Sequence, residues 1–171
     1  GSFDGAFAQL SDSISTMSER GVPADAAVLV ALHAQLDALS ALICEAEIRF
    51  DRHELWRNAG AGSVRAWFTD AYGLSRKEAS RVARRAERLE SWPEVVEAWG
   101  AGRLSGAQVD VVVAAVPTRF VSEFAMQAGE VVRVLQPLDT AQTEVAMRQW
   151  VRCAEASDGP EQFIDRPSGV H

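Results

Sequence analysis

The sequence predicts an all-α protein, a compact bundle of about six or seven helices with one long helix near its N-terminus. Apolar residues recur at spacings of three and four along most of the chain, and residues suited to capping helices precede several of these stretches. Of the 171 residues, 47% are hydrophobic, which is enough to bury one sizeable core. We therefore expect a single domain over residues 3–156. Gly1 and Ser2 have the composition of a tag remnant, and residues 157–171 that of a linker or the start of a following region.

The first third of the sequence contains a short amphipathic helix and a long one. Residues 3–17 place apolar side chains three and four apart, and Gly21 and Pro23 end this pattern. Residues 24–56 contain no glycine and no proline, and their apolar residues follow a heptad pattern. This stripe is either the seam of a bundle within the chain or the seam of a homodimer. Its residues are Leu29, Leu32, Leu36, Leu39 and Ile43.

The middle of the sequence contains two short helices with the layout of a helix-turn-helix. Ser63 is placed to cap a helix over residues 64–72, which Gly73 ends. Ser75 then caps the next helix, and Glu78 completes a capping box. Two helices joined by a three-residue turn that contains glycine are typical of DNA-binding motifs. The same stretch resembles the turn and recognition helix of bacterial repressors of the lac type.

The second helix of this pair concentrates positive charge in an acidic protein. Residues 74–90 contain six basic and three acidic residues, which leaves 11 of the 17 basic and 21 of the 24 acidic residues for the rest of the chain. At about 100° per residue the cations fall on one arc and small apolar residues fall opposite. The basic arc contains Lys77, Arg81, Arg84, Arg85 and Arg88.

This basic helix suggests contact with double-stranded DNA. Arg76 and Lys77 lie near its N-terminus, where a recognition helix reads base edges. Arg84, Arg85 and Arg88 lie further along and would bind phosphates. Alternatively, the arginines pair with acidic surfaces of this chain or of a partner, or they form a solvated face. The net charge of -7 argues against general affinity for nucleic acid, so contact would be local to this helix.

The second half of the sequence predicts further helices. One runs from Pro93 to Gly100, one is capped by Ser105 with Gln108, one covers residues 118–135, and one begins at residue 139 or 140. The five tryptophans occupy helix ends or apolar faces, which favours packing in the core. For Trp92 and Trp99, stacking on an unpaired base is the alternative.

Catalytic and metal-binding patterns are not evident. His33, His53 and His171 lie far apart, and Cys44 and Cys153 have no basic partner nearby in sequence. No phosphate-binding loop or dinucleotide fingerprint occurs. We expect no enzyme activity in this stretch of sequence, and we expect no metal, cofactor or small-molecule substrate. Two isolated thiols, no signal peptide and no run of about 18 apolar residues lead us to expect a cytoplasmic protein with no membrane contact, associated with the nucleoid if it binds DNA.

A larger set of motifs resembles one protein family. Gly-Leu-Ser-Arg at 73–76 is followed by Trp-Pro at 92–93, then by Leu-Ser at 104–105 and Gln-Val at 108–109. This order resembles the amino-terminal domain of unknown function number 222, found in actinobacterial proteins of the thirteen-E-twelve repeat type, which commonly carry a C-terminal HNH endonuclease domain. The resemblance implies an α-helical, DNA-associated module and supplies no catalytic residue, although the full-length protein could add a nuclease domain. We expect a non-catalytic DNA-binding or assembly domain of an HNH-endonuclease-like protein. The alternative is an oligomerisation or protein-interaction module that uses the long heptad helix.

Overall fold

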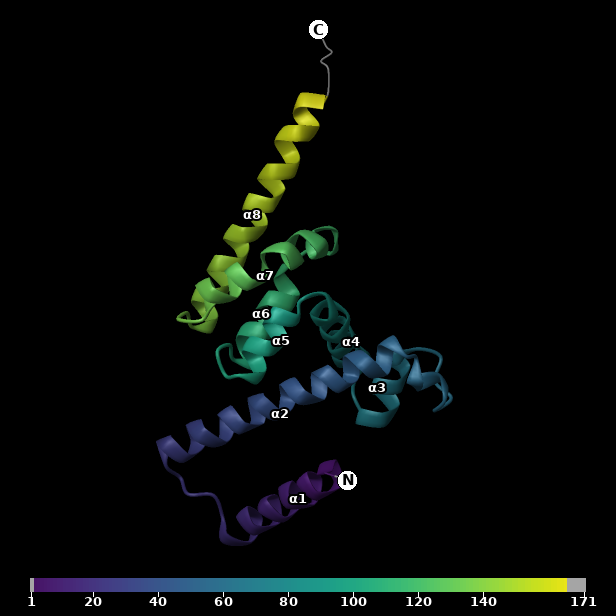
Figure 1. Cartoon of the computed structure of the whole chain (residues 1–171), viewed down its shortest axis with the longest axis vertical. Helices are drawn as coiled ribbons and strands as arrows, with labels where there is room; N and C mark the ends of the chain where they lie inside the picture. The colour runs from purple at the N-terminus through teal and green to yellow at the C-terminus, as the bar shows by residue number, and fades with distance from the viewer. Residues whose placement is uncertain (1, 166–171) are drawn as a thin grey trace. The chain divides into compact units, whose positions relative to one another are not determined.

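The computed structural model describes residues 2–165, with side chains described up to residue 158, and every regular element in this part of the chain is a helix (Figure 1). This confirms the predicted all-α class. The described residues form eight α-helices, one more than the upper end of the predicted number. In chain order they are α1 (Ser2–Arg20), α2 (Ala26–Arg52), α3 (Val64–Tyr72), α4 (Arg76–Ser91), α5 (Pro93–Gly100), α6 (Gly106–Ala115), α7 (Val121–Leu135) and α8 (Thr140–Asp165).

Contacts divide the chain into two units, Gly1–Leu36 and Asp37–His171, and the single domain predicted for residues 3–156 spans both. The described part of the first unit consists of α1 and the first three turns of α2. Helix α1 has no buried residue, and its Phe3 and Phe7 rings stack with centroids 6.0 Å apart. It ends at Arg20, and the Gly21 that follows has a φ of +79°, which is accessible to glycine, and an N–H that donates to the Met17 carbonyl.

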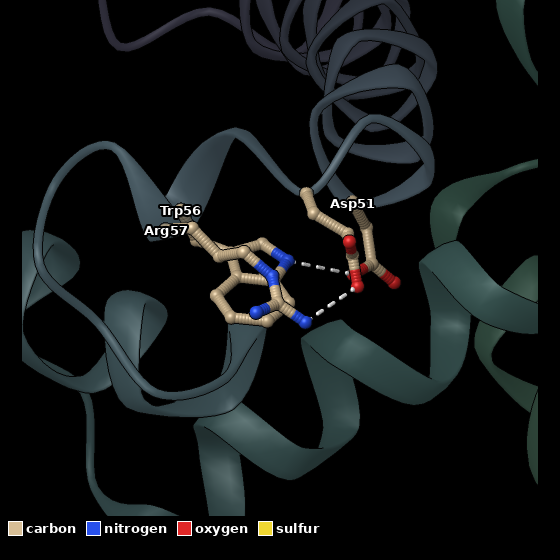
Figure 2. Close-up of polar contacts among 4 residues, drawn as sticks. Asp51, Trp56 and Arg57 are labelled. Atoms are coloured by element: carbon tan, nitrogen blue, oxygen red, sulfur yellow. Dashed lines mark hydrogen bonds and ion pairs between the residues drawn. The ribbon is translucent and has the colours of Figure 1, made fainter.

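Helix α2 ends at Arg52, four residues before the predicted end at Trp56. Glu54 adopts a left-handed φ of 50°, and a short 3₁₀ helix, η1 (Leu55–Arg57), follows. Figure 2 shows how this corner is held: the Trp56 indole N–H donates to Asp51 Oδ1 at 3.1 Å, and the Arg57 guanidinium donates to Glu54 Oε1 at 3.1 Å. The buried Trp56 ring therefore anchors the turn that leads into α3.

Helices α3 and α4 form at the predicted positions. Ser63 Oγ accepts from the Ala66 N–H, and Ser75 and Glu78 form the predicted capping box. Gly73 has a φ of +67° and ends α3, so that three residues connect the helices. The two helices pack through a small cluster in which alanines allow close approach. Its buried residues are Phe68, Ala79 and Ala83.

The main core lies among α4, α5, α6, α7 and α8. Trp92 packs against Phe124 with ring centroids 4.5 Å apart, and its indole N–H donates to the Val121 carbonyl at 3.0 Å. Trp92 and Trp99 are both fully enclosed, so the alternative that they stack on an unpaired base is wrong. The largest enclosed side chains are Trp92, Trp99, Phe68, Phe120, Phe124, Leu89, Leu104, Leu135 and Met147.

Helix α6 runs through this core and is anchored at its N-terminus by Gln108. The predicted capping box is confirmed, since Ser105 Oγ accepts from the Gln108 N–H and the Gln108 side chain accepts from the Ser105 N–H. The Gln108 side-chain amide also contacts the carbonyls of Leu135 and Leu138 at 2.8 and 2.9 Å, and Thr143 Oγ1 at 3.0 Å. One buried amide thus joins α6 to the turn between α7 and α8.

Helix α8 begins after Asp139, whose carboxylate accepts from the Gln142 N–H at 2.7 Å. Its backbone stays helical to Asp165, past Gly159 and Pro160, where the sequence predicts a linker from residue 157. Residues 166–171 of that predicted linker lie outside the described part of the chain.

Replacing Gln108 with alanine should destabilise the domain by about 3 kcal/mol, because buried carbonyl groups would lose their donor. Chemical denaturation followed by circular dichroism measures this change. Gln149→Ala, on the exposed face of α8, is the matched control and should change stability by less than about 0.5 kcal/mol. Equal midpoints for the two variants would contradict this role of Gln108.

Candidate nucleic-acid interface

A basic concave surface lies between α3, α4 and α6. It is a hollow of about 370 Å³ lined by five cationic side chains and a single carboxylate, that of Asp110. Ser80, Val113 and Ala114 complete its wall. A hollow with this excess of positive charge attracts anions, because the field of grouped cations is concentrated in a concave surface. Its cations are Arg65 of α3 and Lys77, Arg81, Arg84 and Arg85 of α4.

Neighbouring hollows extend this surface. One of about 370 Å³ shares Arg65 and Ser80 with the first and adds Arg76 and Asp70. Another, of about 410 Å³, shares Arg81 and Asp110 and adds Glu144 and Arg148 of α8. We call the combined surface the basic groove. Its positive charge comes from Arg65, Arg76, Lys77, Arg81 and Arg84, with Arg148 of α8 at one end, and the carboxylates of Asp70, Asp110 and Glu144 also line it.

Four of the six cations predicted to bind DNA are exposed in this groove. Arg76, Lys77, Arg81 and Arg84 all lie on the solvent side of α4. Arg85 also lines the groove but is mostly covered, with 22% of its side chain exposed. Arg65 and Arg148 are additional cations that the sequence pattern of α4 could not indicate, because they lie on other helices. Only the packing of α3 and α8 brings them to this surface.

Arg88, the sixth predicted cation, has a different role. It is 5% exposed, and its guanidinium donates to the carbonyls of Val113 and Val116 and to Thr118 Oγ1. The Val113 carbonyl lies in the last turn of α6 and the Val116 carbonyl on the residue that follows it, where the helix itself supplies no donors and Pro117 contributes no N–H. Burial lowers the pKa of Arg88, but a guanidinium stays charged at neutral pH. Arg88 therefore closes the C-terminus of α6 and is not available to bind a phosphate.

Arg85 lies between two carboxylates. Its Nη2 is 3.9 Å from Glu47 Oε1 of α2, its Nη1 is 3.8 Å from Asp110 Oδ1, and its guanidinium lies 5.3 Å from the centroid of the Trp99 ring. The Tyr72 hydroxyl donates to Glu47 Oε2 at 2.9 Å. Sequence patterns did not indicate this cluster, since its members come from α2, α3, α4, α5 and α6.

Glu47 and Tyr72 of this cluster, and the neighbouring thiol of Cys44, have shifted pKa values. Burial raises the pKa of the Glu47 carboxyl above its ordinary value, and the Tyr72 hydrogen bond and the Arg85 charge act in the opposite direction. Burial also raises the pKa of the Cys44 thiol to about 11. Burial and then the Glu47 hydrogen bond raise the pKa of Tyr72. Cys44 and Tyr72 are therefore uncharged near neutral pH, and the charge of the buried part of the cluster depends on Glu47.

The predicted seam of α2 is exposed at every seventh residue. Leu29, Leu36 and Ile43 are 55%, 59% and 44% exposed, and Leu32 and Leu39 are partly covered. By length and composition α2 could cross a membrane, since its best window has a mean hydropathy of 1.8. The absence of an uninterrupted run of about 18 apolar residues does not reveal this property, because polar residues interrupt the apolar stretch of α2 without lowering its mean hydropathy much. Core helices of soluble proteins share it, and the C-terminal half of α2 does bury Ala41, Cys44 and Ile48.

No group of three or more His, Cys, Asp or Glu residues is close enough to hold a metal ion within the described residues. Cys44 is buried and Cys153 is exposed, and both are free thiols. His171 lies outside the described part of the chain.

The fold and the groove together define an all-helical domain with a basic surface on α3 and α4. The chain belongs to the DUF222 family, a domain of unknown function, whose family profile matches residues 24–159. The resemblance seen in the sequence is thereby confirmed, and the matched region runs from the start of α2 into α8. No curated protein and no solved structure matched the chain.

Replacing Arg88 with methionine should lower the free energy of unfolding by about 3 kcal/mol, because the buried carbonyls at the end of α6 would lose their donor. Thermal and urea unfolding measure the loss. Arg84→Met, one turn earlier on the exposed side of α4, should stay within about 0.5 kcal/mol of the unmodified protein. If the Arg88 variant were as stable as the Arg84 variant, the buried hydrogen bonds would not contribute as described.

Proposed function

We propose that this domain binds double-stranded DNA through the basic groove and has no catalytic role of its own. The observation that carries the proposal is the segregation of charge: five cations surround one hollow that contains a single carboxylate, in a chain whose net charge is -7. A solvated helix face would not require cations from α3 and α4 to converge on one hollow. Binding to a polyanion accounts for their convergence.

The groove residues divide by position on α4. Arg76 and Lys77 occupy its first turn, beside the Ser75 cap, and are placed to reach base edges or nearby phosphates. Arg65, Arg81 and Arg84 lie further along the groove and would bind phosphate oxygens. The positive end of the α4 dipole adds to the attraction at the first turn. Arg88 is excluded from this contact set by its buried hydrogen bonds.

We further propose that the domain serves a larger HNH-endonuclease-like protein of actinobacterial type in the cytoplasm, at the nucleoid. The support is the resemblance of the sequence motifs to proteins that commonly carry such a nuclease domain. In that arrangement the basic groove supplies affinity for DNA, and a separate nuclease domain cleaves it.

Neutralising four groove cations as Arg65→Gln, Lys77→Gln, Arg81→Gln and Arg84→Gln should reduce the salt dependence of duplex binding. Each lost phosphate contact removes about 0.9 from the slope of log K against log salt, so the combined variant should lose between about three and four units. Fluorescence anisotropy with a labelled duplex measures the slope over a range of salt concentrations. Binding of the unmodified protein should persist near physiological salt.

The matched control is Arg133→Gln. Arg133 is an exposed arginine of α7 that pairs with Glu130 at 3.1 Å and does not line the groove. This variant should keep the salt slope of the unmodified protein. The proposal would be overturned by an unmodified protein that does not bind duplex DNA, or by equal slopes for the control and the groove variant.

The exposed α2 stripe favours a second function, homodimerisation through Leu29, Leu36 and Ile43. Their seven-residue spacing and exposure are those of a coiled-coil seam that lacks its partner. In this alternative the arginines pair with acidic protein surface.

Replacing Leu36 with aspartate should convert a dimer into a monomer in sedimentation velocity, because the seam would bury an unpaired charge. Leu42→Asp is the matched control: it is an exposed leucine of the same helix, about 120° away from Leu36, and should leave the dimer intact. A monomeric unmodified protein would argue against this second function.

A further inference from the structure

Arg85 is a cation whose hydrogen-bonding capacity is largely unused. Its distances of 3.8 and 3.9 Å to Asp110 and Glu47 are ion-pair distances, too long for hydrogen bonds. Within the described part of the chain, the buried Nε atom of Arg85 has no hydrogen-bond acceptor, and the buried Oε1 atom of Glu47 has no hydrogen-bond donor. Arg85 is held over the Trp99 ring and lines the basic groove. The two Nη groups, whose contacts with carboxylates are this long, would gain from a hydrogen-bond acceptor that enters the groove.

Two carboxylates offset this one guanidinium. Glu47 approaches from α2 with a side chain that is 6% exposed, and Asp110 approaches from α6 with a side chain that is 52% exposed. The other titratable groups facing Glu47 are Tyr72 of α3 and Cys44 of α2, and both are uncharged near neutral pH. At the inner end of the groove the single positive charge of Arg85 is therefore outnumbered by two carboxylates, whereas in the first hollow the other cations, Arg65, Lys77, Arg81 and Arg84, outnumber the carboxylate of Asp110.

We propose that Arg85 is a masked phosphate contact, released to a phosphodiester in the groove when Glu47 takes up a proton and its carboxylate no longer opposes the incoming anion. This inference rests on the proposed DNA binding and adds a means of regulating it. Asp110, at the open side of the same guanidinium, is the second mask and competes directly with the phosphate for Arg85.

Protonation of Glu47 and binding of an anion at Arg85 should favour each other. Protonated Glu47 is uncharged, so an anion near Arg85 is repelled less and binds more tightly. Reciprocally, a bound anion favours the protonated form, so binding should take up protons. Because burial raises the pKa of Glu47, this uptake occurs above the ordinary acid range of glutamate, and affinity should rise as the pH falls through the raised pKa.

The test compares duplex affinity from about pH 8 to about pH 5 at constant salt in three proteins. The unmodified protein should bind more tightly as the pH falls. Glu47→Gln keeps an acceptor for the Tyr72 hydroxyl but is permanently uncharged. It should bind about tenfold more tightly at the alkaline end, the effect of one charge-assisted hydrogen bond, and its affinity should depend less on pH. Asp110→Asn should also bind more tightly across the range.

Two further variants make the comparison specific. Glu45→Gln removes an exposed carboxylate from the same helix and should keep the pH dependence of the unmodified protein. Adding Arg85→Gln to Glu47→Gln should abolish the gain in affinity. A Glu47→Gln variant that binds no more tightly, or that keeps the full pH dependence, overturns the proposal, provided that circular dichroism shows it folded. If the Glu47→Gln variant is unfolded, the Asp110→Asn variant is used instead. An Asp110→Asn variant that binds duplex DNA no more tightly than the unmodified protein overturns the proposal.

A second measurement separates this inference from DNA binding itself. The nitrogen-15 and proton shifts of the Arg85 Nε–H group are followed during titration with sulfate, an anion whose charge does not change over this pH range. A response that saturates at lower sulfate concentration in Glu47→Gln supports masking even if duplex DNA does not bind. No response in either protein overturns it. Loss of DNA binding in the groove variants together with unchanged binding in Glu47→Gln would keep the proposed function and reject this mechanism.

Discussion

The structure depends on satisfying the backbone of α6, a helix whose two ends lie among apolar side chains. Helix ends leave several N–H and carbonyl groups without partners, and burying such groups unpaired is costly. At the N-terminal end, Ser105 Oγ accepts from the Gln108 N–H and the Gln108 side chain accepts from the Ser105 N–H, while the Gln108 amide donates to the carbonyls of Leu135 and Leu138. At the C-terminal end, Arg88 donates to the carbonyls of Val113 and Val116. These two side chains fix the position of α6 relative to α4, α7 and α8.

This constraint also creates the groove. Because Arg88 ties the last turns of α4 to the end of α6, the preceding turns of α4 lie beside α6 and form one wall of the hollow. The cations of α4 therefore grade from buried to exposed along a single helix: Arg88 is structural, Arg85 is partly covered and paired with carboxylates, and Arg84 and Arg81 face solvent. A helix that contributes to both the core and the groove couples stability to binding.

Dimerisation through α2 and DNA binding through the groove use different parts of the molecule and are compatible. Only pairing of the groove arginines with an acidic protein surface would compete with DNA. The basic groove involves α3 and α4, whereas the exposed stripe belongs to α2. A dimer through α2 would carry two grooves, and two linked weak contacts with DNA bind more tightly than either alone. Local affinity of this kind suits an acidic protein, because repulsion by the rest of the chain limits binding of DNA elsewhere on its surface.

The sequence by itself determined the features whose partners lie within a few residues. The all-α class, the caps at Ser63, Ser75 and Ser105 and the glycine end of α3 follow from side chains that bond three residues away or from the backbone freedom of glycine. The basic face of α4 follows from helical periodicity alone. Family membership could be recognised for the same reason, because its motifs are these local signals.

The tertiary structure decided which of those cations are free. Periodicity places Arg84, Arg85 and Arg88 on one arc, but it cannot show that α6 covers part of that arc. The partners of Arg88 are 25 to 30 residues away, and Glu47, which opposes Arg85, lies on another helix. Burial and long-range pairing depend on how helices meet, whereas a helix considered alone has only a polar side and an apolar side. For that reason the sequence could indicate a basic surface, and only the packing of α4 against α6 showed which of its arginines can contact a ligand.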